Sequence, residues 1–189
     1  MVKKGSKTEH NLLASFAGES QARNRYTMYA GVAGKEGFKQ IQALFLETAD
    51  HERVHAQAFF AHLPGGVAQI TASYPGDIGT TAENLKFAAD GENEEHTEIY
   101  PGAADVADEE GYPEVAKVFR QIAKVEVEHE KRYRRLLKNV EEGTVFKRDG
   151  KVFWKCRKCG RVVEATGAPL RCPTCDHPQS HFELLVENY

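Results

Sequence analysis

The chain has 189 residues, of which 41% are hydrophobic and 28% are charged, and its formal net charge is −3. This length suits one medium domain, or a domain with a small appendage. The slightly acidic balance argues against a nucleic-acid or membrane-surface binder. No apolar run approaches the roughly 20 residues that cross a bilayer, and the first residues lack the apolar core of a secretory signal. We therefore expect a cytoplasmic protein.

Apolar residues that recur every three or four positions predict four amphipathic helices in the larger, N-terminal part of the chain. The first two are expected over about residues 8–34 and 38–63, and the third opens at a candidate capping box formed by Thr80 and Glu83. The inward stripe of the third helix is expected to end at Ile99. The fourth carries its apolar stripe over residues 115–140. Because one long connection joins the second and third helices, the pattern predicts an all-α four-helix bundle.

The inward stripe of each predicted helix carries ionisable residues where apolar ones are expected. In chain order they are Glu19, Glu52, His55, Glu92, Glu95, Glu126 and His129. Burying an unpaired carboxylate is costly, so such a group takes up a proton or needs a cation. Arg23 is the one cationic side chain that we expect nearby, so multivalent metal ions are the economical source of positive charge.

A Glu-x-x-His motif occurs twice, at residues 52–55 and 126–129. A single motif of this kind is weak evidence, because about one match is expected by chance in a chain of this composition. A further glutamate stands at a matched distance before each motif: Glu19 is 33 residues before the first, and Glu92 is 34 residues before the second. Solvated charges on misassigned helix faces would not explain this repeat. It predicts a pseudo-twofold site of the di-iron or di-manganese carboxylate type.

The stretch His-Glu-Arg-Val-His at residues 51–55 also matches the zinc-protease signature H-E-x-x-H, with His51 and His55 as ligands. The second half of the repeat does not reproduce this signature, because Val125 stands at the position equivalent to His51. The longer protease pattern, which adds a glycine and a third histidine, is not matched either. A glutamate from another helix could still complete a zinc site. Otherwise we expect His51 on the helix surface or beside a metal ligand.

All four cysteines lie near the C-terminus in the spacing C-x2-C-x12-C-x2-C, as Cys156, Cys159, Cys172 and Cys175. Two such pairs in a cytosolic chain predict a tetrahedral four-sulfur site for zinc or for a single iron. Spacing alone does not choose between an iron centre and a structural zinc ribbon. We place the domain boundary near residue 145, which gives a bundle over residues 1–144 and a small metal-stapled domain over 145–189.

Taken together, these motifs resemble the rubrerythrin family. The runs KCRKCG at 155–160 and RCPTCDHP at 171–178 are similar to the two iron-binding knuckles of rubredoxins, and Phe153, Trp154 and Phe182 are expected to pack around them. The similarity covers essentially the whole chain and includes GESQARNRY in the first helix and VEVEHEKRY in the last. It implies a ferritin-like di-iron bundle followed by a rubredoxin-like domain.

The resemblance also implies a role for each ligand. Glu52 and Glu126 would bridge two irons, Glu92 and His129 would serve one of them, and Glu19 would serve the other.

For the remaining residues, the resemblance implies that one iron exchanges His55 for Glu95 on oxidation. Tyr26 and Tyr100 match tyrosines that hydrogen-bond the glutamate ligands, although packing in an amphipathic core explains buried tyrosines equally well. The four cysteines would hold a third iron, which zinc can replace.

The activity implied by the resemblance is reduction of hydrogen peroxide to water, in defence against oxidative stress. A diferrous pair would supply two electrons, and the cysteine-bound iron would return them singly. An external NAD(P)H-dependent rubredoxin reductase, or a similar donor, would load that iron, and the protein would form a homodimer. Two alternatives stay open: a ferroxidase or oxygen-reducing bundle, and an iron-storage bundle with a structural zinc ribbon.

Overall fold

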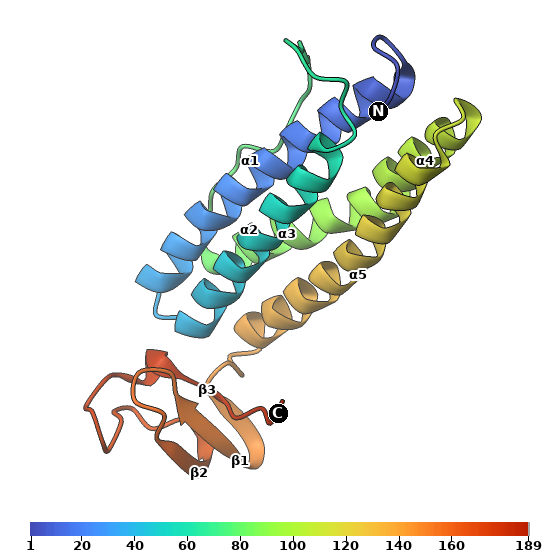
Figure 1. Cartoon of the computed structure of the whole chain (residues 1–189). Coiled ribbons are helices and arrows are strands. Elements are labelled where there is room, and N and C mark those ends of the chain that lie inside the picture. The colour runs from blue at the N-terminus through green and yellow to red at the C-terminus, as the bar shows by residue number, and fades with distance from the viewer. Residues whose placement is uncertain (189) are drawn as a thin grey trace.

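The computed structural model describes residues 1–188, and a bundle of long helices makes up most of it (Figure 1). In chain order, the helical elements are α1 (Lys7–Lys35), α2 (Lys39–Phe60), α3 (Thr81–Glu94), the π-helical turn η1 (Glu95–Ile99), α4 (Tyr100–Glu109) and α5 (Pro113–Glu141). Because α3, η1 and α4 follow one another without a break, they form one long member of the bundle. The prediction of an all-α four-helix bundle is confirmed.

The helix boundaries follow local sequence signals. Thr80 and Glu83 form the predicted capping box at the start of α3, in which the side chain of each bonds the backbone N–H of the other. α2 ends at Phe60, three residues before the predicted end. Gly37, between α1 and α2, has φ +88°, a backbone conformation that favours glycine, and it reverses the chain there.

The third member of the bundle departs from the predicted helical stripe. The backbone N–H of Tyr100 bonds to the carbonyl of Glu95, five residues back instead of four, so η1 contains one extra residue per turn. This shift exposes Ile99, which is 44% accessible, and buries Tyr100, which is 2% accessible. The prediction that Ile99 faces the core is therefore wrong, and Tyr100 takes the inward position.

The charged residues of the bundle lie between two apolar layers. On α5, Phe119 belongs to one buried apolar cluster and Tyr133 to the other, while Glu126 and His129 stand between them. The same order holds on α1 and α2. Apolar packing on both sides therefore separates a belt of ionisable groups from water in the middle of the bundle.

The C-terminal part of the chain is a small antiparallel sheet at the end of the bundle that lies away from the N-terminus (Figure 1). Its strands are β1 (Lys147–Cys156), β2 (Val162–Gly167) and β3 (Phe182–Leu184), in the order β2-β1-β3. The 3₁₀ turn η2 (Gln179–His181) precedes β3. The domain boundary that we predict near residue 145 falls in the segment between α5 and β1, and it stays a prediction.

Aromatic side chains fill the core of the sheet and connect it to the bundle. Trp154 and Phe182 are buried beside the cysteines, as predicted. Phe153 is 53% exposed, because successive residues of a strand point to opposite faces, so the prediction that it packs with them is wrong. Phe146 stacks on Phe38 of the α1–α2 connection, with ring centroids 6.2 Å apart. Along residues 1–188, no helix combines the length and the apolar character needed to cross a membrane.

Candidate metal centres

Six of the seven predicted di-iron ligands come together in the middle of the bundle. They form two groups of four, and in each group the potential ligand atoms lie within 4.8 Å of one another. The groups are Glu19, Glu52, His55 and Glu126, and Glu52, Glu92, Glu126 and His129. All six side chains are buried. Because Glu52 and Glu126 belong to both groups, the arrangement suits two metal ions that share two carboxylates.

Both histidines of the repeat turn Nδ1 toward the carboxylates. Nδ1 of His55 lies 2.9 Å from an oxygen of Glu52 and 2.9 Å from one of Glu126. Nδ1 of His129 lies 2.7 Å from Glu126, 3.4 Å from Glu52 and 3.5 Å from Glu92. These separations are short, but within residues 1–188 Nδ1 of each histidine has no hydrogen-bond partner. The same holds for both carboxylate oxygens of Glu52 and of Glu126. Buried atoms arranged in this way fit ligands that face shared cations.

The protonation of the carboxyl groups leads to the same conclusion. Burial, together with the negative charge of neighbouring glutamates, raises the pKa of Glu19, Glu52 and Glu95 well above the usual range of a carboxyl group. Burial acts in the same direction on Glu126, but the two adjacent histidines lower its pKa to about 2. A protein without metal must therefore hold several protons here, whereas bound cations allow all the carboxylates to ionise. Carboxylate oxygens with imidazole nitrogens suit iron or manganese.

Two buried tyrosines bond the outer glutamates of the cluster. Tyr26 of α1 donates its hydroxyl to Oε1 of Glu92 over 2.6 Å, and Tyr100 of α4 donates its hydroxyl to Oε1 of Glu19. Each half of the repeat thus supplies a tyrosine to the glutamate of the other half. Burial, followed by the nearby glutamate, raises the pKa of both phenols, so both remain neutral donors. Both rings also pack in the apolar layers. Each tyrosine therefore both bonds a glutamate and packs in the core.

Glu95, the seventh predicted ligand, lies outside both groups. It is half-buried in η1 and lines a cavity of about 250 Å³ together with Gly18, Arg25, Tyr74 and Tyr100. The structure therefore brings His55, and not Glu95, into the ligand cluster. The exchange between these two side chains stays a prediction.

Arg25 is a buried cation that the sequence analysis missed. It is 7% exposed, whereas Arg23, the arginine expected near the site, points to solvent. Nη1 of Arg25 donates to Oε1 of Gln21 and to the carbonyl of Pro75, in the long connection between α2 and α3. The four-residue spacing of Gln21 and Arg25 marks a shared helix face. The contact with Pro75 depends on tertiary structure.

His51 contacts the ligand cluster from outside. Its Nδ1 lies 3.1 Å from Nε2 of His129, and it belongs to neither ligand group found among residues 1–188. The pair of ligands that a zinc protease would require, His51 with His55, is therefore not formed. Sequence reasoning allowed His51 to lie beside a ligand, but it did not identify His129 as its partner.

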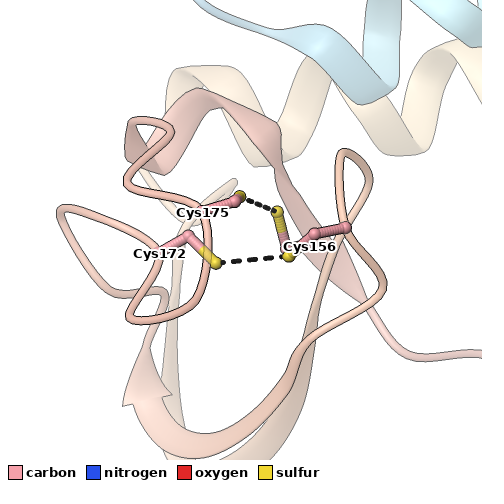
Figure 2. A group of neighbouring side chains, drawn as sticks. Cys156, Cys172 and Cys175 are labelled. Carbon is pink, nitrogen blue, oxygen red and sulfur yellow. Dashed lines mark hydrogen bonds between the residues drawn. The ribbon is translucent and has the colours of Figure 1, made fainter.

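The four cysteines form a second cluster, beside the sheet. Figure 2 shows the sulfur atoms of Cys156, Cys172 and Cys175 turned toward one another. Sγ of Cys156 lies 3.8 Å from Sγ of Cys175, and Sγ of Cys159 lies 3.6 Å from Sγ of Cys172. A tetrahedral ion with metal–sulfur distances of about 2.3 Å needs sulfur atoms roughly 3.8 Å apart, so the cluster is compatible with one iron or zinc.

The protonation of Cys172 suits such a site. Burial opposes ionisation of the thiol, but the backbone N–H groups of Thr174 and Cys175 lower its pKa to about 6. The lowered pKa favours the thiolate of Cys172, which is the form that binds metal. At Cys175, a backbone hydrogen bond from His177 lowers the pKa, but burial and the other cysteine thiols raise it to about 12.

Comparisons with known proteins cover both parts of the chain. Residues 10–137 match the family described as Rubrerythrin, and residues 154–183 match the rubredoxin-like domain of rubrerythrin. The chain is 58% identical to the rubrerythrin of Porphyromonas gingivalis over 98% of its own length and 94% of the relative. It is 56% identical to rubrerythrin-1 of Clostridium acetobutylicum over 98% of each chain.

A solved structure with a similar fold is the fully reduced, all-ferrous state of nigerythrin. Its TM-score is 0.65 at 29% sequence identity, and the match covers 97% of this chain and 89% of the nigerythrin chain. The likeness therefore extends over the bundle and the sheet together.

Proposed function

The chain belongs to the rubrerythrin family, with a ferritin-like di-iron domain and a C-terminal rubredoxin-like domain, and on that premise we propose that it reduces hydrogen peroxide to water. The observation that carries this proposal is the pair of buried ligand groups with two shared carboxylates, in the same chain as a four-cysteine cluster. Two irons in the first site would supply the two electrons that peroxide reduction requires, and iron in the second would replace them one at a time.

In this proposal the side chains of the two clusters hold the metals. The irons of the bundle would be held by Glu19, Glu52, His55, Glu92, Glu126 and His129, and the single iron by Cys156, Cys159, Cys172 and Cys175. Tyr26 and Tyr100 fix the orientation of Glu92 and Glu19 through their hydroxyl groups. The apolar layers on both sides exclude bulk water from these ligands.

The cavity that Glu95 lines is the proposed route for peroxide. Its volume of about 250 Å³ is ample for a molecule of two oxygen atoms, and Tyr100 stands in its wall beside Glu95. Since Tyr100 bonds Glu19, the cavity adjoins one ligand group. We propose that Glu95 replaces His55 as a ligand when the site is oxidised. Its place at the cavity wall supports this role. So does its closeness to the ligands Glu19, Glu92 and Glu126, because burial, together with their negative charges, raises the pKa of Glu95.

The electron donor and the assembly are also part of the proposal. An external NAD(P)H-dependent reductase would load the cysteine-bound iron, and the protein would act as a homodimer, as the resemblance to rubrerythrins implies. The exposed position of Cys159 supports access by a donor, because one edge of the cysteine cluster reaches the surface.

The test compares oxidants of the reduced protein. Protein is purified with its native metals, its iron and zinc are measured, and the absorption change is followed after mixing with hydrogen peroxide or with oxygen. We expect iron in both sites and faster reoxidation by peroxide. Faster reoxidation by oxygen would favour a ferroxidase. A colourless cysteine site that holds zinc after purification from iron-replete cells would contradict electron transfer through it.

A further inference from the structure

The two halves of the bundle hold their histidines differently. Nε2 of His129 lies 3.1 Å from Nδ1 of His51, and the two rings are nearly parallel, at 8° and with centroids 5.3 Å apart. His51 directly precedes Glu52 on α2, whereas His129 belongs to the second motif, on α5. A residue of the first half therefore contacts the histidine of the second half.

The direction of this hydrogen bond follows from the other nitrogen of His129. Because Nδ1 of His129 faces the carboxylates, at 2.7 Å from Glu126, it is the nitrogen available to a metal. In a ligating histidine, Nε2 then carries the hydrogen, and a partner that accepts it fixes both the tautomer and the ring orientation. Nδ1 of His51 is that acceptor.

The equivalent interaction is missing in the other half. In the repeat, Val125 directly precedes Glu126 and occupies the position that His51 occupies before Glu52. Val125 is 37% exposed, and its aliphatic side chain has no hydrogen-bond acceptor. Within residues 1–188, Nε2 of His55 forms no hydrogen bond, although its Nδ1 faces the cluster as that of His129 does. The two halves thus repeat the ligand geometry, but they do not repeat the hydrogen bond to Nε2, the ring nitrogen that faces away from the cluster.

We propose that His51 is a positioning residue that holds His129 in the ligand cluster. We also propose that His55 can move out of the cluster because Val125 offers it no such hydrogen bond. Departure of His129 would break its hydrogen bond to His51 as well as its bond to a metal. Departure of His55 would break only a bond to a metal. The difference between the two halves therefore determines which histidine is released. This inference rests on the proposed exchange of His55 with Glu95, but the support of His129 can be measured whether or not the protein is a peroxidase.

Proton exchange in the reduced, iron-loaded protein tests the support of His129. The ring N–H of a ligating histidine gives a paramagnetically shifted NMR signal that disappears as the proton exchanges with solvent. We expect His51→Leu to speed exchange of the His129 signal about fivefold, the effect of losing one neutral hydrogen bond. His51→Gln, which keeps an acceptor, should restore much of the protection. His10→Leu, at an exposed position of α1, is the matched control.

Release of iron to a chelator gives a second reading of the same variants. It should be faster in His51→Leu than in His51→Gln or His10→Leu. If His51→Leu matched the unmodified protein in both proton exchange and iron release, the positioning role of His51 would be wrong.

A substitution at position 125 tests the second half of the inference. Val125→His supplies an acceptor beside His55, so we expect slower exchange of the His55 N–H and slower oxidation by peroxide, with unchanged iron content. An unchanged His55 signal and an unchanged oxidation rate would overturn the role given to Val125. Slower exchange of the His55 N–H with an unchanged rate of oxidation by peroxide would show that the new hydrogen bond to His55 forms. It would then contradict the proposed ligand exchange instead.

Discussion

Tyr26 donates its hydroxyl to Oε1 of Glu92 over 2.6 Å, and both side chains are buried, so α1 and α3 are joined at the edge of the ligand cluster. The ring of Tyr26 also packs edge-on against Tyr133, with centroids 5.6 Å apart. The hydroxyl and the ring of one side chain thus have separate roles, which substitution can distinguish.

Replacing Tyr26 by phenylalanine should keep the packing and remove the support of Glu92. Because the lost bond is to a carboxylate, we expect the free energy of unfolding of the metal-loaded protein to fall by about 1.5–3 kcal/mol in guanidinium titrations. Tyr29→Phe is the control, because its hydroxyl bonds the carbonyl of Asp77 and not a ligand. Iron should leave Tyr26→Phe faster than Tyr29→Phe in the presence of a chelator. Equal rates would show that the hydroxyl of Tyr26 does not support the site.

The two ligand groups predict different metal losses for shared and unshared carboxylates. Glu52→Ala removes a member of both groups, so we expect it to lower the occupancy of both iron positions. Glu19→Ala affects one group and should leave about one iron in the bundle. Iron per chain, measured after subtraction of the cysteine-bound ion, distinguishes the two variants. Equal losses would mean that Glu52 is not shared.

The metal-free protein should lose stability as pH rises from about 6.5 to 9. Raised carboxyl pKa values, as at Glu19 and Glu52, mean that the folded protein keeps protons that the unfolded chain releases, so stability falls as pH rises above about 4.5. His129, with a pKa raised to about 9, contributes stability that is full below 6.5 and is lost as pH rises through 9. Glu126, with its pKa near 2, loses its contribution only in acid.

We expect the loss of the His129 contribution alone to lower the free energy of unfolding by roughly 2–3 kcal/mol between pH 6.5 and pH 9, and the carboxyl groups add to this decrease. Denaturant unfolding of protein stripped of metal measures it. The metal-loaded protein is the control. Its ligands are already deprotonated, so its stability should change less over this range. Rising stability of the stripped protein across this range would contradict the pKa directions.

Glu95→Ala should slow reduction of peroxide while leaving iron binding largely intact, because Glu95 lies outside both ligand groups. Glu98→Ala, an exposed glutamate in the same π-helical turn, serves as the control for the loss of one acidic side chain. Steady-state turnover and iron content should be measured on the same preparations. Normal turnover by Glu95→Ala would exclude its proposed role as the exchanging ligand.

Cys172→Ser should empty the cysteine site and loosen the small sheet without unfolding the bundle. Trp154 is the single tryptophan of the chain and is buried in the sheet, so its fluorescence reports on this domain alone. We expect its emission to shift to longer wavelength, with most of the helical circular dichroism retained. An unchanged emission spectrum would mean that the sheet folds without its metal.

The sequence determined those features that depend on local spacing. Glu-x-x-His places two ligands on one helix face because residues three apart are neighbours on a helix. Its repetition predicted a twofold cluster, and the cysteine pairs predicted a four-sulfur site. Binary patterning was sufficient to predict the four-helix bundle, because stripes of period 3.6 must face a common core.

Only the tertiary structure decided what each side chain meets across the bundle. The sequence predicted Ile99 in the core, but one additional residue in η1 turned Tyr100 inward to bond Glu19. Likewise, His51 pairs with His129 and not with its neighbour His55, because α2 and α5 pack side by side at that level. Helical period describes one helix at a time, whereas these contacts depend on the register between helices, which packing sets.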